Sequence, residues 1–147
     1  MKLYCRNYGV IILSLAFIIE LLGYGVRHSF SVFFPYILEE HNWKRSDTAL
    51  IFSLHLLFYG IAAPLCGLLV ERCNVKLMVL SGTLILSTAT FLCFFAYKLW
   101  HYYFLFGLIA PVGLALMGTP ILNPTIINWF PQNRGAAIGL AQTGGGM

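Results

Sequence analysis

The sequence predicts an all-α fold, a polytopic bundle of membrane helices, and three observations lead to this prediction. Of the 147 residues, 59% are hydrophobic and only 10% are charged, whereas soluble domains usually carry about 25% charged residues. The mean hydropathy is +0.81. The few charges are also spaced so that they separate long apolar segments. We therefore expect lipid to be the main solvent of this chain.

The intervals without charge define the membrane spans. A helix needs about 20 mostly apolar residues to cross the roughly 30 Å hydrocarbon core with its backbone hydrogen-bonded internally. Residues 48–70 and 77–97 contain no formal charge and predict two clear spans. Residues 8–36 predict a longer first span, which is exceptional because it carries Glu20 and Arg27.

A fourth span is predicted over residues 100–129, which are too many for one straight helix. Proline lacks a backbone donor and clashes with the preceding turn, so we expect bends at Pro111, Pro120 and Pro124 and an end at Pro131. A fifth helix begins near residue 134, and its Gly and Ala are typical of a helix that packs closely on a neighbour. Residues 1–147 thus form a single domain of four spans and the start of a fifth, and we expect a fragment of a longer protein.

Basic residues in the short connections indicate a cytoplasmic N-terminus. With that orientation the cytoplasmic set is Lys2, Arg6, Arg72, Lys76 and Arg134, against Lys44, Arg45 and Lys98 outside. This bias follows the positive-inside rule and predicts a multi-pass protein of the cell membrane. A secretory signal peptide is the alternative for the first segment, but no small-residue cleavage site follows it.

Several functional classes are not expected. The net charge is +4, but the basic residues are scattered, so we predict no nucleic-acid partner. The cysteines have no metal-ligand spacing and are interpreted as packing residues, namely Cys5, Cys66, Cys73 and Cys93. We find no nucleophile and base pair, and Gly144 to Gly146 lack the Lys-Ser/Thr of a phosphate loop. The sequence therefore predicts no enzyme activity, no metal and no cofactor.

The first span has a polar face near the middle of the membrane. At 100° per residue, five side chains fall within one third of the helix circumference: Glu20, Tyr24, Arg27, His28 and Ser31. An ionised side chain at mid-bilayer costs about 2.5 to 3.5 kcal/mol and normally faces a bundle interior or a wet cavity. We therefore predict a solute pathway that includes Glu20, Tyr24 and Arg27. In the alternative, Glu20 pairs with a cation elsewhere and Arg27 extends to the interface.

The second span carries His55, followed one turn later by Tyr59. Imidazole titrates near neutral pH, so His55 could line the same cavity or relay a proton. A single histidine inside a membrane is as often an interhelical hydrogen-bond donor. In the same span Gly60 and Gly67, with small residues between them, predict a close-packing face.

The connection after the second span is very short and charged. Its residues Gly67, Glu71, Arg72 and Lys76 resemble the loop between the second and third helices of the major facilitator superfamily, G-x-x-x-D-R/K-x-G-R/K-R/K. The chain departs from this pattern at Glu71 for Asp, at residue 74 and at residue 75. Asn74 replaces a glycine and is expected to keep the turn, since Asn tolerates the left-handed conformation next best.

Three further segments resemble the branch of oxalate/formate antiporter-like and monocarboxylate transporter-like proteins. Arg27 to Pro35 resembles its first-helix ending, and Trp43 to Asp47 resembles its entry to the second helix. Trp129 to Gly139 resembles the W-F-x-x-x-R-G-x-A-x-G opening of its fifth helix. The resemblance implies a partial N-terminal six-helix half of a transporter that holds its substrate between two halves near the midplane.

The resemblance also implies roles for individual residues. Glu71 and Arg72 would belong to a cytoplasmic gate that latches the two halves together, with partner residues in helices missing from this chain. Arg27 would attract an anionic substrate, because a guanidinium pairs bidentately with carboxylates. Polar residues of the fourth span would line the same cavity, namely Asn123, Asn128 and Thr119.

We therefore predict secondary active transport of a small solute by alternating access, an organic anion such as a monocarboxylate, with a coupling proton or ion. The expected partners are the lipid bilayer, the solute and the remaining transporter helices. One alternative is a non-transporting truncated membrane protein that associates with a full-length carrier. Another is a pore-forming homo-oligomer with passive flux.

Overall fold

The computed structural model describes residues 2–41, 43–130 and 133–146, and all of its regular elements are helices. In chain order they are α1 (Lys2–His41), α2 (Arg45–Leu69), α3 (Val75–Cys93), α4 (Leu99–Tyr102), the π-helical segment η1 (Tyr103–Ile109), α5 (Ala110–Met117), α6 (Thr119–Trp129) and α7 (Arg134–Gly146). Four segments are long and apolar enough to cross a membrane: Gly9–Phe30, Arg45–Leu69, Val75–Cys93 and Leu99–Trp129. The predicted all-α membrane bundle is confirmed.

The helix ends differ from the predicted spans mainly at α1 and α3. The helix α1 continues beyond residues 8–36 at both ends, and its apolar span is Gly9–Phe30. The helix α3 ends at Cys93, before residue 97. After it the chain tightens, because the backbone N–H groups of Phe94 and Phe95 donate to carbonyl groups three residues earlier. Composition does not signal this end, since the residues on both sides of it are apolar.

The fourth span is interrupted rather than smoothly bent. Pro111 lies in the first turn of α5, which continues directly from η1, and Pro120 lies in the first turn of α6. Only α6 begins after a break, so only there does the missing backbone donor of a proline cost little. Between α5 and α6 the helix breaks at Gly118, whose backbone is extended (φ −95°, ψ −152°). Pro124 lies inside α6 without ending it. Pro131, the predicted end of the span, lies outside the described residues.

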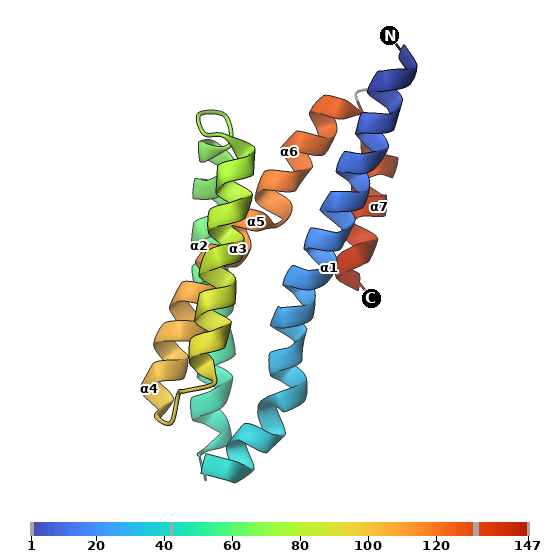
Figure 1. The fold of residues 1–147 in the computed structure, drawn as a ribbon. Helices are drawn as coiled ribbons and strands as arrows, with labels where there is room; N and C mark the ends of the chain where they lie inside the picture. Colours follow the sequence, from blue (N-terminus) through green and yellow to red (C-terminus); the bar gives the residue numbers. More distant parts are fainter. Residues whose placement is uncertain (1, 42, 131–132, 147) are drawn as a thin grey trace.

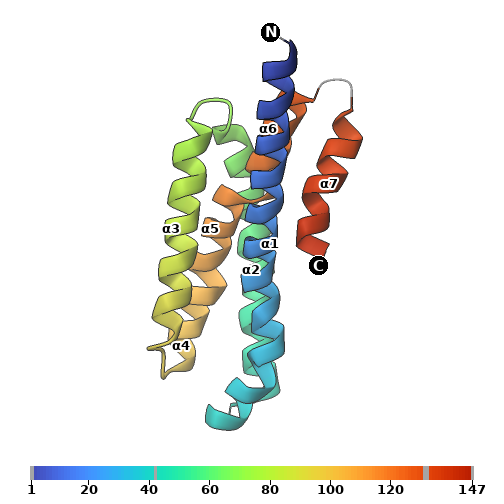
Figure 2. The ribbon, with the colours of Figure 1, turned by 45° about the vertical axis from the view of Figure 1, so that its right-hand side comes forward.

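The helices form two packed groups joined by α6. Figure 1 shows α2, α3 and α5 side by side and α1 next to α7, and the view in Figure 2 agrees. The helix α6 contacts both groups. The start of α1, the turn between α2 and α3 and the start of α7 all lie at one end of the bundle (Figure 1). These are the connections that carry the basic residues predicted to be cytoplasmic.

Glycines allow two pairs of helices to approach closely. A Cβ atom on Gly82 of α3 would lie 2.7 Å from the carbonyl oxygen of Gly113 on α5. A Cβ atom on Gly144 of α7 would lie 2.5 Å from the carbonyl oxygen of Phe17 on α1. The predicted close packing of the fifth helix is thus confirmed. The close-packing face predicted in α2 is wrong at its glycines, since Gly60 and Gly67 face open space in the described structure.

Candidate functional site

Glu20 lies buried at the centre of a group of hydroxyl-bearing side chains. It is 3% exposed, and within the described residues only Glu20 and His55 are buried polar or charged side chains. The hydroxyl group of Thr119, at the start of α6, is a polar neighbour of the Glu20 carboxyl group and of the Tyr59 hydroxyl group. It also lies 3.5 Å from the hydroxyl oxygen of Tyr24. Thr119 therefore joins side chains from α1 and α2.

Arg27 completes this arrangement two helical turns after Glu20. Its guanidinium carbon lies 5.7 Å from the ring centre of Tyr24 and 5.5 Å from that of Tyr59. Both distances are within the range of cation–π attraction, which is about 6 Å. Among the described residues Arg27 forms no ion pair, and its Nε atom is buried without a hydrogen-bond acceptor. We call Glu20, Tyr24, Arg27, Tyr59 and Thr119 the polar cluster.

His55 is not a member of the polar cluster, although it precedes Tyr59 by one turn of α2. Its side chain is 1% exposed, and its Nδ1 atom lies 2.9 Å from the carbonyl oxygen of Phe106 in η1. The ring stacks on Phe106 at 4.9 Å and on Phe52 at 6.2 Å between centres. The structure thus places His55 in an interhelical hydrogen bond, which is one of the two uses considered from the sequence.

The remaining polar residues predicted for the pathway differ in their exposure. Asn123 is half-buried one turn after Thr119, on the same side of α6, whereas Asn128 is exposed. The side chain of Ser31 is outside the described part of the chain. His28 is exposed and stacks on Tyr24 at 6.2 Å between ring centres.

His28 also lines a hollow that the sequence did not indicate. This hollow has a volume of about 610 Å³ and lies between α1 and the end of α7. Its lining residues are Leu21, Tyr24, Gly25, His28, Gly144, Gly145 and Gly146. The periodicity of the first span placed His28 on the polar face but could not show that glycines of α7 leave space beside it. Tyr24 therefore has one side towards the polar cluster and one towards the hollow.

Comparison with known proteins identifies the family. The family model of the Major Facilitator Superfamily matches residues 13–147. The chain belongs to the major facilitator superfamily. The family resemblance read from the sequence is confirmed.

Curated relatives within this superfamily carry the name monocarboxylate transporter. The chain is 34% identical over 140 residues to monocarboxylate transporter 11 of Homo sapiens, covering 95% of this chain and 30% of the relative. It is 33% identical over 139 residues to monocarboxylate transporter 3 of Rattus norvegicus, covering 94% of this chain and 28% of the relative. The facilitator chain thus spans roughly a third of the length of these relatives. No solved structure matches it significantly.

The charged turn of this facilitator chain lies between α2 and α3. Glu71, Arg72 and Lys76 are exposed and form no ion pair with any described residue, and Gly67 lies near the end of α2. Asn74 has an extended backbone (φ −72°, ψ 116°), and its side chain accepts a hydrogen bond of 3.0 Å from the Lys76 backbone N–H. The expected left-handed conformation at Asn74 is therefore wrong. Asn74 instead caps the start of α3, which Asn does as well as Asp or Ser.

No metal centre is found in the described part of the facilitator chain. Within residues 2–41, 43–130 and 133–146, no three His, Cys, Asp or Glu side chains gather closely enough to hold a metal ion. Cys66 is buried, Cys93 is half-buried and Cys73 is exposed, and all three are free thiols. The side chain of Cys5 lies outside the described set. The polar cluster is therefore the arrangement with the clearest chemistry, because it combines a buried acid, a cation and hydroxyl groups.

Proposed function

We propose that this chain forms part of the solute pathway of a secondary transporter that carries a small organic anion, such as a monocarboxylate, by alternating access. One observation carries the proposal: the half-buried guanidinium of Arg27 lies inside a candidate span without an acidic partner among the described residues. Its distances to two tyrosine rings support a fixed position. The names of the monocarboxylate transporters similar to this chain support the class of solute.

The energetics of Arg27 favour an anionic ligand. A cation at the centre of a membrane costs about 2.5 to 3.5 kcal/mol, and Arg27, about 10 Å from mid-span, bears part of this cost. The two cation–π contacts offset part of this free-energy cost, by about 0.5 to 2 kcal/mol each. The rings cover the face of the guanidinium, whereas its N–H donors point along its edge. A carboxylate bound at this edge would accept two of these hydrogen bonds and neutralise the charge.

Glu20 is the proposed position for a coupling proton or ion. Its carboxyl group is buried near mid-span, seven residues and about 10 Å along the helix from Arg27. Tyr24 links the two charged groups, because its hydroxyl oxygen lies 3.5 Å from that of Thr119 and its ring lies 5.7 Å from the Arg27 guanidinium carbon. A proton or cation bound at Glu20 and an anion bound at Arg27 carry opposite charges. These charges stabilise each other across the cluster. Asn123 and His55 are proposed to lie along the same pathway, with His55 acting through its hydrogen bond.

The charged turn is proposed to act as a conformational gate. Gly67, Glu71, Arg72 and Lys76 would meet the remaining transporter helices when the carrier faces outward. Glu71, Arg72 and Lys76 are exposed and have no ion-pair partner among the described residues, which leaves these charges available for such contacts. The turn would lie at the cytoplasmic surface of the cell membrane together with the N-terminus. The clustering of the predicted cytoplasmic connections at one end of the bundle supports this orientation (Figure 1).

The test is uptake of a radiolabelled short monocarboxylate into proteoliposomes that contain the protein. We expect saturable uptake, and the neutral amide of the same acid should not compete. Arg27→Gln should raise KM by roughly 10- to 100-fold, because a charge-assisted hydrogen bond contributes about 1.5 to 3 kcal/mol. The matched control is Arg45→Gln, which removes the same charge from an exposed position at the start of α2. Its KM should not change.

Three results would contradict the proposal. Equal effects of the Arg27 and Arg45 substitutions would place the anion elsewhere. Flux that does not saturate would indicate the pore-forming homo-oligomer. Absence of uptake, together with stable association with a full-length carrier, would indicate the non-transporting membrane protein instead.

A further inference from the structure

The fourth span contains a carbonyl group that its own helix cannot satisfy. In the π-helical segment η1 the hydrogen bonds shift by one residue, so that the Ala110 N–H donates to the Leu105 carbonyl five residues earlier. The carbonyl of Phe106 would in turn accept from residue 111. That residue is Pro111, which has no N–H. Phe106 is buried, and an unsatisfied carbonyl there would cost the protein stability.

His55 supplies the missing donor from a different helix. Its Nδ1 atom lies 2.9 Å from the Phe106 carbonyl oxygen. A carbonyl oxygen can only accept, so Nδ1 carries the proton. The Nε2 atom is buried without a hydrogen-bond partner among the described residues, and a proton there would have no acceptor. The geometry therefore selects one tautomer of the imidazole ring.

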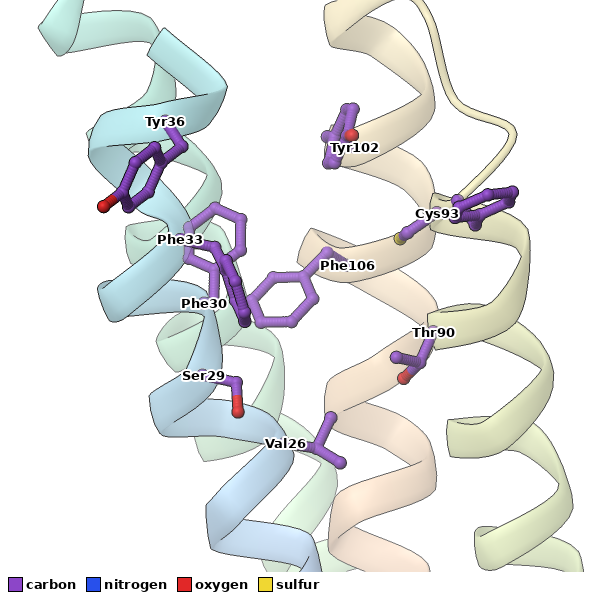
Figure 3. A pocket seen from close by; sticks show the side chains of 10 residues that line it. Val26, Ser29, Phe30, Phe33, Tyr36, Thr90, Cys93, Tyr102 and Phe106 are labelled. Carbon is purple, nitrogen blue, oxygen red and sulfur yellow. The ribbon is translucent and has the colours of Figure 1, made fainter. Parts of the chain in front are cut away.

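Aromatic rings from two neighbouring helices also pack against Phe106. Phe106 stacks on His55 of α2 at 4.9 Å and on Phe30 of α1 at 4.3 Å between ring centres. Figure 3 shows Phe106 reaching towards Phe30 and Phe33, where these residues help to line a hollow of about 530 Å³. The hydrogen bond from His55 thus fixes η1 at the place where α1, α2 and the fourth span meet.

We propose that His55 is a positioning residue, whose Nδ1–H replaces the helical donor that Pro111 lacks and so holds the π-helical segment of the fourth span in register. The residues that follow η1 share this register, because α5 leads through Gly118 directly to Thr119. A one-residue shift from π-helical to α-helical winding would rotate α5 and α6 by about 100° relative to α2. His55 therefore acts on the polar cluster from a distance, through the winding of the fourth span.

A double-mutant cycle tests this role. His55→Phe keeps the ring stacking and removes the donor, whereas Pro111→Ala restores a backbone N–H beside the Phe106 carbonyl. In the natural background, His55→Phe should lower the folding equilibrium constant by roughly 5- to 150-fold, the effect of one unsatisfied buried carbonyl. In the Pro111→Ala background the same substitution should have an effect of less than about threefold, because the carbonyl has another donor. Unfolding of the purified protein in detergent measures both values without any solute.

Conservative replacement and the tautomer give two independent readouts. His55→Asn places an amide N–H near the position of Nδ1, so it should retain most of the stability that His55→Phe loses. In protein labelled with ¹⁵N at histidine and reconstituted in lipid, NMR should show His55 protonated at Nδ1 and unprotonated at Nε2. Recovery of folded protein in the double variant supports the proposal even where His55→Phe alone does not fold.

Other results would overturn it. An equal cost of His55→Phe in both backgrounds would mean that Pro111 does not create the need for a donor. A proton on Nε2 in the NMR spectrum would exclude donation to Phe106. Equal loss of stability in the Asn and Phe variants would show that the ring shape, and not the Nδ1 donor, is what the fold requires.

Discussion

The crossing of α3 and α5 gives the sharpest prediction of stability. A Cβ atom on Gly113 would lie 2.8 Å from the Leu86 backbone nitrogen and 2.9 Å from the Gly82 carbonyl oxygen. Both neighbours are backbone atoms, which cannot rotate away. The two helices must therefore separate by about half an ångström, and such a gap forfeits a quarter or more of each van der Waals contact along the crossing. Overpacking of this kind costs about 1 to 3 kcal/mol.

The matched control for Gly113→Ala is Gly60→Ala. Gly60 also lies inside a helix, but it has open space around it in the described structure. Both substitutions gain the same helix propensity, about 0.5 to 1 kcal/mol, so this gain cancels when the variants are compared. We expect the free energy of unfolding of Gly113→Ala to be about 1 to 3 kcal/mol lower than that of Gly60→Ala, measured by denaturant or thermal unfolding in detergent. Equal values for the two variants would refute the close crossing.

Three more substitutions test single hydrogen bonds by the same unfolding assay. Asn74→Ala removes the cap of α3 and should cost about 0.5 to 2 kcal/mol, whereas Asn74→Gly should cost only a few tenths; a larger loss with Gly would contradict the cap. Tyr103→Phe removes a hydroxyl group that donates to the Asp47 carbonyl oxygen at 2.8 Å, and should cost about 0.5 to 1.5 kcal/mol. The exposed Tyr97 gives its control, and an equal effect of Tyr97→Phe would argue against that bond. Thr119→Val should cost about 1 to 3 kcal/mol, because the hydroxyl group of Tyr24 loses its partner and the buried Glu20 carboxyl group loses a polar neighbour. Thr119→Ser keeps the hydroxyl group and should behave like the natural protein, so indistinguishable Ser and Val variants would show that the hydroxyl group does not matter.

The membrane spans could be predicted from the sequence because charge is costly in lipid. The predicted second span, residues 48–70, lies within three residues of α2 at both ends, and the predicted fourth span nearly coincides with Leu99–Trp129. The early end of α3 at Cys93 could not be predicted, because the residues that follow are as apolar as the helix. Hydropathy marks where a chain lies in the membrane, but backbone hydrogen bonds decide where a helix ends.

The sequence predicts that the fourth span is interrupted, but it does not predict at which residues. Pro111, Pro120 and Pro124 were the expected bends; the first two lie in the first turns of new helices, whereas Pro124 lies inside α6. The break itself is at Gly118, and the change of winding in η1 precedes Pro111. A proline alters the hydrogen bonds of the residues before it, so its structural effect appears upstream of its own position. A buried histidine on a neighbouring helix was the one available signal for the orphaned carbonyl, and periodicity alone cannot pair the two.

Within the candidate site, the helical period placed Glu20, Tyr24 and Arg27 on one face of the first span, and the structure brings these three together. The contributions of Tyr59 and Thr119 depend on the packing of α1 against α2 and α6, which a single sequence does not encode in any local pattern. The close crossing of α3 and α5 at Gly82 and Gly113, here called the glycine crossing, was missed for the same reason. Its two glycines lie 31 positions apart in the chain and become neighbours only when α3 and α5 pack.

Contacts of the polar cluster cross the boundary between the two groups of helices. The helix α1 packs on α7, and α2 and α3 pack on α5, but α1 touches α2 and α5 only sparsely. The contacts of Arg27 with Tyr59, and of Tyr24 with Thr119, cross this boundary. Hydrogen bonds weaken steeply with distance and angle, so a shift between the groups breaks the cluster before it disturbs the glycine crossing inside one group. Under the proposed alternating access, a ligand that bound the cluster more tightly in one arrangement of the two groups than in the other would shift the balance between these arrangements.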